Sequence, residues 1–314
     1  MVLGLINKKI NEITMDIFVN NETSELESVI LGIAIDKGTS RGINPMMRKH
    51  LANNTYPTED NIYNEIKTFE DVLKGNGVEV LRPNNLSQVE QIFTRDIGFV
   101  IEDYFFISNM KHAVRAVELK GIQHTLDRID RSKQIVIPEG IIIEGGDVIL
   151  WNDFIFIGIG DRTTANAIPF IQNTFPNKNV FGFDIVVDQK SADNNILHLD
   201  CTFQPIGTDE AIIYHNGFEK HPKEILDLFP KDKLLEVTLD EKNRMFPNVF
   251  SISPNKIVVE QGFGRLKSGL IERGYEVFEV DYSETSKLGG LLRCSTLPLK
   301  RKENQTRNSG SLYP

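Results

Sequence analysis

The sequence predicts an α/β protein in which one unit, a β-hairpin followed by a helix and a strand, recurs around a ring. Hairpin-like segments begin at residues 96, 147, 200 and 248, at intervals of 51, 53 and 48 residues. Helical patterns and short apolar runs lie between them, and the two ends of the chain hold the material for a fifth unit. A repeat of this period is typical of radial or stacked architectures.

Each hairpin is predicted from two runs rich in Val, Ile and Phe that flank a turn. β-Branched and aromatic residues favour strands, whereas Asn, Asp, Gly and Pro favour turns. The hairpins are expected in Asp96–Ser108, Asp147–Gly158, Asp200–Tyr214 and Asn248–Glu260. Their turns are expected at Glu102-Asp103, Asn152-Asp153, Gly207-Thr208-Asp209 and Pro254-Asn255.

The clearest helix has apolar residues along one face, namely Ile62, Ile66, Phe69, Val72 and Leu73. Thr58 is its expected N-cap, and Gly75-Asn76-Gly77 is its expected end. Weaker helical patterns cover residues 168–171, 225–228 and 266–271, and short strands are predicted over 78–81, 180–187 and 275–280. Leu291–Leu299 is expected to join Ser28–Ala34 in the fifth unit, because closing a ring removes exposed sheet edges.

Composition places the chain among ordinary globular proteins. Its 314 residues are 40% apolar, 25% charged and 9% aromatic, which excludes a disordered, collagen-like or disulfide-scaffold protein. The formal charge of −9 disfavours nucleic acid and suits a cationic small substrate, although acidity also serves solubility. The sequence contains no run of about 18 apolar residues, so no membrane segment is predicted. We expect one catalytic domain over residues 1–302, a flexible tail over 303–314, and a cytoplasmic location, because Met1–Asp16 lacks a small-residue cleavage site.

Polar residues recur at the same point of successive units, at or just before each hairpin. In a ring of repeats, equivalent positions converge on the axis, so these side chains are expected to share one pocket. Taken singly, each has a structural interpretation as a turn residue, a cap, a buried histidine or a small apolar thiol. The residues are Asp96, Glu144, Asp147, His198, Asp200 and, where the fifth unit begins, Cys294.

These residue types favour covalent chemistry on a planar cation. A cysteine thiolate and a histidine form a nucleophile and acid–base pair, and Glu144 is the carboxylate expected to orient the histidine. Asp96 and Asp200 match a guanidinium, which is rich in N–H donors. A metal site is the rival use of these residues, but no C-x-x-C or H-x-x-x-H spacing supports zinc, so no metal is expected. Cys201 is a second candidate nucleophile, but its odd offset from His198 on a strand would separate the two side chains, so a structural role is predicted.

The ordered motifs resemble those of the guanidine-modifying enzymes of the pentein superfamily, and arginine deiminases most of all. They are Phe93-Thr94-Arg95-Asp96, Glu144-Gly145-Gly146-Asp147, Asp161-Arg162-Thr163, His198-Leu199-Asp200 and Arg293-Cys294-Ser295-Thr296. The resemblance covers residues 28–302. It implies a five-bladed ββαβ propeller with pseudo-fivefold symmetry, consistent with the repeat.

The resemblance also implies a role for each residue. Cys294 is the nucleophile and His198 the general acid–base, while Glu144, Asp96 and Asp200 hold the imidazole and the guanidinium. The implied substrate-binding residues, two of which would face the α-carboxylate of a free amino acid, are Arg115, Arg162 and Asp147.

The expected reaction is hydrolysis of arginine or a close analogue to citrulline and ammonia, through an amidino-cysteine and without a cofactor. Amidino transfer to an amine is the alternative, because His198-Leu-Asp-Cys-Thr-Phe203 resembles glycine amidinotransferases. Dimethylarginine hydrolysis ranks lower, because those enzymes tend to lack the acid at position 200. A non-catalytic pentein binding protein ranks lowest, because the full catalytic set is present. A homo-oligomer is compatible with the sequence.

Overall fold

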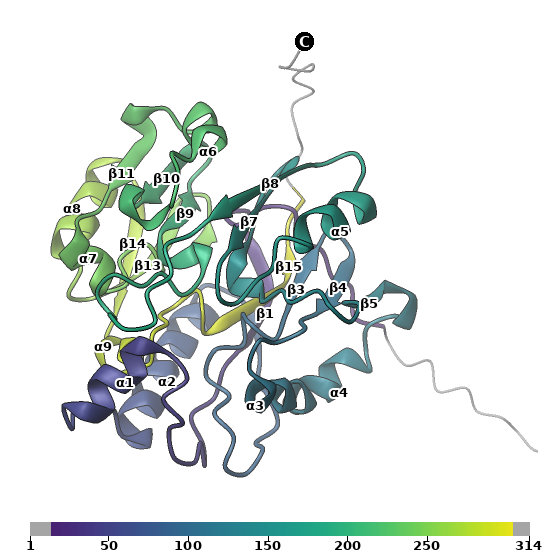
Figure 1. Ribbon diagram of the computed structural model, residues 1–314, viewed down its shortest axis with the longest axis vertical. Helices are drawn as coiled ribbons and strands as arrows, with labels where there is room; N and C mark the ends of the chain where they lie inside the picture. The colour runs from purple at the N-terminus through teal and green to yellow at the C-terminus, as the bar shows by residue number, and fades with distance from the viewer. Residues whose placement is uncertain (1–13, 304–314) are drawn as a thin grey trace, which may run out of the picture.

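The computed structural model describes residues 14–303 of the 314-residue chain (Figure 1). Strands and helices alternate through this range, so the predicted α/β class is confirmed. The predicted tail, apart from residue 303, lies outside the described residues, as do residues 1–13 of the N-terminal segment. No helix within 14–303 has the length and apolar character needed to cross a membrane.

Four antiparallel hairpins lie where the sequence predicts them. They are β3 (Gly98–Ile101) with β4 (Tyr104–Ile107), β6 (Val148–Trp151) with β7 (Phe154–Ile159), β9 (Phe203–Ile206) with β10 (Glu210–Ile213), and β12 (Phe250–Ser253) with β13 (Lys256–Glu260). Glu102 and Asn152 begin the two-residue turns of the first two hairpins with φ of 53° and 56°. Such left-handed values match the twist that a tight hairpin requires.

A third strand pairs in parallel with the second strand of each hairpin. These strands are β5 (Gln134–Val136), β8 (Asn179–Asp184), β11 (Leu234–Glu236) and β14 (Glu276–Val280). Parallel neighbours need a crossover connection. The crossovers contain α3 (Ala113–Ala116) and α4 (Gln123–Leu126), α5 (Ala167–Thr174), α6 (Lys223–Leu228), and α8 (Gly264–Glu272). The predicted order of hairpin, helix and strand is therefore present four times.

The chain ends build the fifth unit, as predicted. β15 (Thr296–Arg301) is antiparallel to β1 (Leu26–Leu31), which is parallel to β2 (Glu79–Leu81). α1 (Pro45–Ala52) and α2 (Glu59–Gly75) connect β1 to β2. The Thr58 side chain accepts a hydrogen bond from the Asn61 backbone N–H at 3.2 Å, which confirms the predicted cap. Two short helices, α7 (Leu239–Asn243) and α9 (Ser283–Ser286), precede β12 and β15.

The described residues thus form five separate three-stranded sheets, and strand pairing does not join them into one barrel. Helices occupy much of the periphery in Figure 1, whereas β1, β3 and β7 lie toward the middle. The core lies between neighbouring units. Phe156 of β7 meets Phe203 of β9 edge-to-face at 5.7 Å, and Phe69 of α2 meets Phe250 of β12 at 5.8 Å. This packing fixes the segments that precede the hairpins, where the candidate site residues lie.

Candidate active site

The five predicted catalytic residues are all buried, and each precedes the first strand of a unit. Asp96 precedes β3 and Cys294 precedes β15, while the other three lie at two 3-10 helices, η3 (Gly145–Asp147) and η4 (Leu199–Cys201). Asp96, His198 and Cys294 line one small cavity, together with Arg115 and Arg162. The structure therefore brings together residues that are up to 198 positions apart, from Asp96 to Cys294 (294 − 96).

His198 is oriented by one carboxylate and faces another. Its Nε2 lies 2.9 Å from Glu144 Oε2, and its Nδ1 lies 3.7 Å from Asp96 Oδ1. Nδ1 and Asp96 Oδ1 lack any hydrogen-bond partner among the described residues. Burial acts to lower the pKa of His198, but Asp96, Asp147 and the bond to Glu144 outweigh it and raise that pKa to about 10. The ring is therefore an imidazolium at neutral pH.

Glu144 is the anionic partner of this ion pair. Burial acts to raise its pKa, but the hydrogen bond with His198 and the charge of Arg162 hold it at about 2. Its other oxygen accepts a hydrogen bond from the Lys111 backbone N–H at 3.0 Å. The carboxylate is fixed from several sides, so it holds the imidazole in one orientation.

The two glycines after Glu144 allow this close packing. A Cβ at Gly146 would lie 2.7 Å from His198 Cγ and 2.9 Å from Asp96 Oδ1. A Cβ at Gly145 would lie 2.2 Å from the Arg95 backbone oxygen. Both distances are shorter than ordinary Cβ contacts, so a side chain at either position would displace its neighbours, and the Gly-Gly pair allows the close approach.

Asp147, predicted to bind substrate, connects two motifs. One of its oxygens accepts from the Thr163 hydroxyl at 2.6 Å, and the other accepts from the Leu199 backbone N–H at 2.9 Å. Burial raises its pKa to about 7. It is fully buried and is not among the residues that line the Cys294 cavity.

Cys294 lies beside Asp200. Its Sγ is 3.6 Å and 3.9 Å from the two carboxylate oxygens of Asp200, and its backbone N–H donates to Asn248 Oδ1 at 3.1 Å. Arg293 Nη1 donates to Asp200 Oδ2 at 2.8 Å. A hydrogen bond with Cys201, burial and the charge of Asp200 raise the pKa of the Cys294 thiol well above its usual value. The sulfur is therefore a neutral thiol before a ligand binds.

Cys201 differs from its predicted position. Residues 199–201 form the 3-10 helix η4, not a strand, so the alternation of faces on which the prediction rested does not apply. The Cys201 thiol lies 3.5 Å from Asp200 Oδ1, an oxygen that Cys294 Sγ also contacts at 3.9 Å. Both cysteines of the chain therefore lie at one carboxylate.

Arg115 and Arg162, predicted to bind a carboxylate, both pair with protein carboxylates. Arg115 makes four hydrogen bonds, two to Glu118, one to Asp96 and one to the Phe93 backbone oxygen. An arginine has five N–H donors, so these four leave one. Arg162 donates to Glu144 at 3.2 Å, while its buried Nε has no hydrogen-bond partner among the described residues. Arg162 thus retains more donors for a ligand than Arg115 does.

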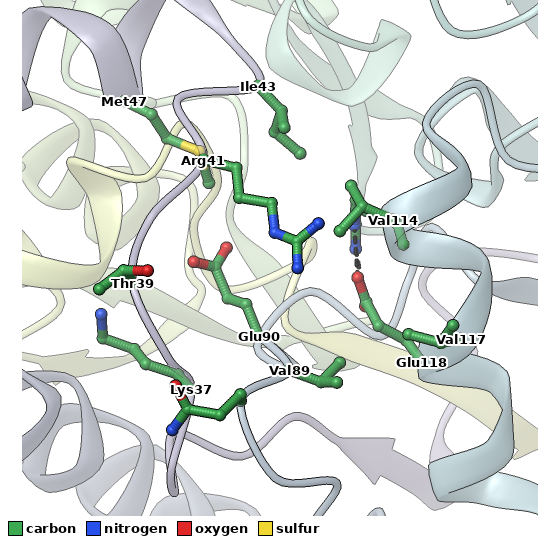
Figure 2. Close-up of a pocket in the computed structure, with 12 residues that line it drawn as sticks. Lys37, Thr39, Arg41, Ile43, Met47, Val89, Glu90, Val114, Val117 and Glu118 are labelled. Atoms are coloured by element: carbon green, nitrogen blue, oxygen red, sulfur yellow. Dashed lines mark hydrogen bonds and ion pairs between the residues drawn. The ribbon is translucent and has the colours of Figure 1, made fainter.

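A wider cavity of about 180 Å³ adjoins the Cys294 cavity (Figure 2). Four residues line both cavities: Ile43, Met47, Glu90 and Arg115. Figure 2 shows Arg41 and Glu90 pointing into this space. Arg41 has no hydrogen bond or ion pair with another residue in the range 14–303. Burial raises the pKa of Glu90. Sequence reasoning missed both residues, because isolated charges in a connecting segment carry no pattern.

Three residues of the site are close enough to hold a metal ion. One ligand atom each from Asp96, Glu144 and His198 lies within 4.8 Å of the others. A nitrogen and two carboxylate oxygens are suitable ligands for zinc and related ions. The same three groups also serve proton transfer and cation binding, which is how we interpret them below.

Comparisons with known proteins agree with this fold. The chain is 35% identical over 254 residues to the uncharacterized protein YkgA of Bacillus subtilis (strain 168), covering 78% of this chain and 84% of that protein. The amidinotransferase SxtG of the Microseira wollei saxitoxin pathway superposes with a TM-score of 0.76 at 17% identity, over 92% of this chain and 98% of that one. The N-terminal domain of ArgZ, a cyanobacterial arginine dihydrolase, was solved with substrate bound. It superposes with a TM-score of 0.76 at 19% identity, over 87% of this chain and 98% of that one.

The family match and the five three-stranded units place the chain in the pentein superfamily of guanidine-modifying enzymes. Within that class the chain belongs to the family described as N,N dimethylarginine dimethylhydrolase, eukaryotic, which matches residues 33–301. The family description names dimethylarginine as the substrate, whereas the sequence motifs favour free arginine over dimethylarginine.

Proposed function

We propose that the chain is a guanidino hydrolase that acts on free arginine or a close analogue, with Cys294 as nucleophile. The observation that carries the proposal is the shared cavity of Cys294, His198 and Asp96, which opens toward a second cavity of amino-acid size. We further propose that residues 1–302 form one catalytic domain, in which the five sheets are blades of a propeller around this site.

Substrate binding would activate the nucleophile. A guanidinium held by Asp96, Asp200 and Glu144 places a positive charge beside the Cys294 sulfur. An opposite charge within about 4–6 Å favours the ionised form, so the raised thiol pKa falls when the cation enters. The thiolate thus forms where its target is bound, and the free enzyme keeps a less reactive thiol.

The first chemical half forms an amidino-cysteine. The thiolate attacks the guanidinium carbon, and the new C–S bond gives a neutral tetrahedral adduct whose N–H groups donate hydrogen bonds to Asp96 and Asp200. The His198 imidazolium then donates its proton to the departing nitrogen as the C–N bond breaks, which releases ammonia. A histidine with a pKa of about 10 carries that proton throughout the neutral range.

The second half hydrolyses the intermediate. His198, now neutral, takes a proton from a water molecule, and the resulting hydroxide attacks the amidino carbon. As the C–S bond breaks, the hydroxyl proton of the adduct passes to the departing sulfur, which releases citrulline and restores the neutral thiol of Cys294. Glu144 keeps the ring in one orientation through both proton transfers.

The wider cavity suits the amino-acid end of the substrate. We assign the α-carboxylate to the free donors of Arg162, the remaining N–H of Arg115 and the unpaired Arg41. Glu90, which accepts a hydrogen bond from the Tyr56 hydroxyl at 3.3 Å, is suited to the α-ammonium group. The cavity would therefore select a free amino acid over a peptide-bound arginine.

Dimethylarginine is the second candidate substrate, and the family match favours it. The same steps would release dimethylamine in place of ammonia. Asp200 opposes this candidate, because a carboxylate 3.6 Å from the sulfur leaves little apolar room for two methyl groups. Amidino transfer would use the same intermediate with an amine in place of water.

Mass spectrometry of the products tests the proposal. The chain is incubated with arginine, with dimethylarginine, and with arginine plus glycine. We expect citrulline and ammonia from arginine. We expect no citrulline from the Cys294→Ser variant, and its melting temperature should equal that of the unaltered chain. Citrulline and dimethylamine from dimethylarginine alone would select the second candidate, and ornithine formed only when glycine is present would select transfer. Full turnover by Cys294→Ser would refute the assignment of the nucleophile.

A further inference from the structure

Cys201 is a buried nucleophilic group that the proposed reaction does not use. It is 3% exposed and lies beside the 2%-exposed Cys294. Both thiols contact the same oxygen, Asp200 Oδ1, at 3.5 Å and 3.9 Å. These are the two cysteines of the whole sequence, so an intramolecular disulfide in this chain has one possible pairing.

The two sulfurs lie on different cavities that share a wall. Cys294 lines the cavity of His198 and Asp96, whereas Cys201 lines a second cavity together with Lys242. The residues common to both linings are Asn44, Leu197 and Gly289. The second cavity has a volume of about 30 Å³, against about 10 Å³ for the first. A site needs roughly 10–15 Å³ to admit one water, so the cavity on the Cys201 side has room for a small oxidant.

The chemistry of the second cavity also favours Cys201 as the first sulfur to react. Lys242 Nζ donates to the backbone oxygens of Asp193 at 2.7 Å and Asn195 at 3.4 Å. An ammonium has three donors, so one remains beside the cavity. A peroxide in this cavity can therefore accept a hydrogen bond from Lys242 while it lies next to the Cys201 sulfur.

We propose that Cys201 and Cys294 are a site of reversible oxidative modification, at which a peroxide joins the two sulfurs in a disulfide. In the first step the Cys201 sulfur attacks hydrogen peroxide. The O–O bond breaks, an S–O bond forms, and Cys201 becomes a sulfenic acid as one water leaves. In the second step the Cys294 sulfur attacks the Cys201 sulfur. The S–O bond breaks, the S–S bond forms, and a second water carries away the thiol hydrogen. Two thiols and one peroxide therefore give one disulfide and two waters.

The functional consequence rests on the proposed function, because a disulfide removes the Cys294 nucleophile. Dithiothreitol would restore it, because thiolate exchange reduces a disulfide. Guanidinium bound in the Cys294 cavity would slow disulfide formation, because the Cys294 sulfur would then face the guanidinium carbon and not the Cys201 sulfur.

Peptide mapping without reductant tests the disulfide independently of activity. The full chain is treated with hydrogen peroxide, digested and analysed by mass spectrometry. We expect a cross-linked peptide containing both cysteines, lighter by two hydrogens than the separate peptides, which disappears after dithiothreitol. We also expect the Cys294→Ser variant to accumulate a dimedone-trappable sulfenic acid at Cys201. Oxidation of Cys294 to sulfinic acid with no cross-link, or a cross-link between two chains, would overturn the proposal.

Inactivation kinetics provide the second measurement. Peroxide should inactivate the unaltered chain reversibly, while Cys201→Ser should keep a larger fraction of its own untreated activity over the same time. Cys201→Ala, with melting temperatures for both variants, controls for a folding defect. If both variants lose activity as fast as the unaltered chain, peroxide attacks Cys294 directly and the relay through Cys201 is wrong. A Cys294→Ser variant that still turned over arginine would refute the proposed function and leave the disulfide test intact.

Discussion

Gly146→Ala is the substitution that most directly tests the geometry of the site. The added Cβ would lie 2.7 Å from His198 Cγ and 2.8 Å from its Nδ1. Ordinary contact begins at 3.4 Å, so the imidazole must move by about 0.7 Å (3.4 − 2.7). The φ angle of Gly146 is not in the left-handed region, so alanine adds a steric clash without backbone strain.

The expected effect is a loss of rate with modest loss of stability. A misplacement of about 1 Å at a catalytic group costs about 10²-fold in rate. At 1.36 kcal/mol per tenfold, this loss corresponds to about 2.7 kcal/mol in the activation free energy. Overpacking of this kind destabilises the fold by about 1–3 kcal/mol, so the variant should still fold.

The assay compares kcat/KM for whichever guanidino compound the product analysis identifies. Gly75→Ala is the matched control, because its Cβ would meet nothing within 4 Å at the end of α2. Melting temperatures of both variants exclude unfolding as the cause. A Gly146→Ala variant that kept kcat/KM within about threefold of the unaltered chain would refute the reasoning, since the imidazole would then tolerate displacement.

Two further predictions concern stability. Phe69→Ala should lower the free energy of unfolding by about 3–5 kcal/mol in urea titrations, because this fully buried ring contacts two aromatic rings edge-to-face. Tyr63→Ala on the same helix, at a 45%-exposed position, should change that free energy by about 0.5 kcal/mol or less, and equal losses would contradict the assigned core. The His198 pKa is raised from 6.5 to about 10, so the stabilisation it provides is complete below pH 6.5 and is lost as pH rises through 10. NMR titration should place the pKa of His198 near 10 and show it lowered in Glu144→Gln, whereas a value near 6.5 in the unaltered chain would exclude the ion pair.

Much of the fold was predictable because its signals are local. A hairpin places its two apolar runs within a dozen residues, and the turn residues between them need left-handed backbone, as at Glu102 and Asn152. The short parallel strands β5 and β11 were not predicted. Each has three residues and exists through pairing with the neighbouring hairpin strand, β4 or β10, so no periodicity marks it.

Some residues of the site were predictable from the sequence and others were not. Repetition along the chain located Asp96, His198 and Cys294, and a common cavity now contains all three. The segment before α1, which contributes Arg41 to the wider cavity, has no such repeat and was not identified. Arg115 was identified as a ligand-binding cation, but its sequence could not reveal that Glu118 and Asp96 use most of its donors.

The sequence by itself determined which chemical groups precede each repeated hairpin, because that order depends on neighbours along the chain. Only the tertiary structure decided which of those groups touch. Cys294 meets Asp200 across 94 residues, and Arg293 meets Glu22 across 271. Contacts at such separations depend on how whole units pack together. Because residues 199–201 form a 3-10 helix and not a strand, the Cys201 thiol contacts the same carboxylate oxygen of Asp200 as Cys294 does.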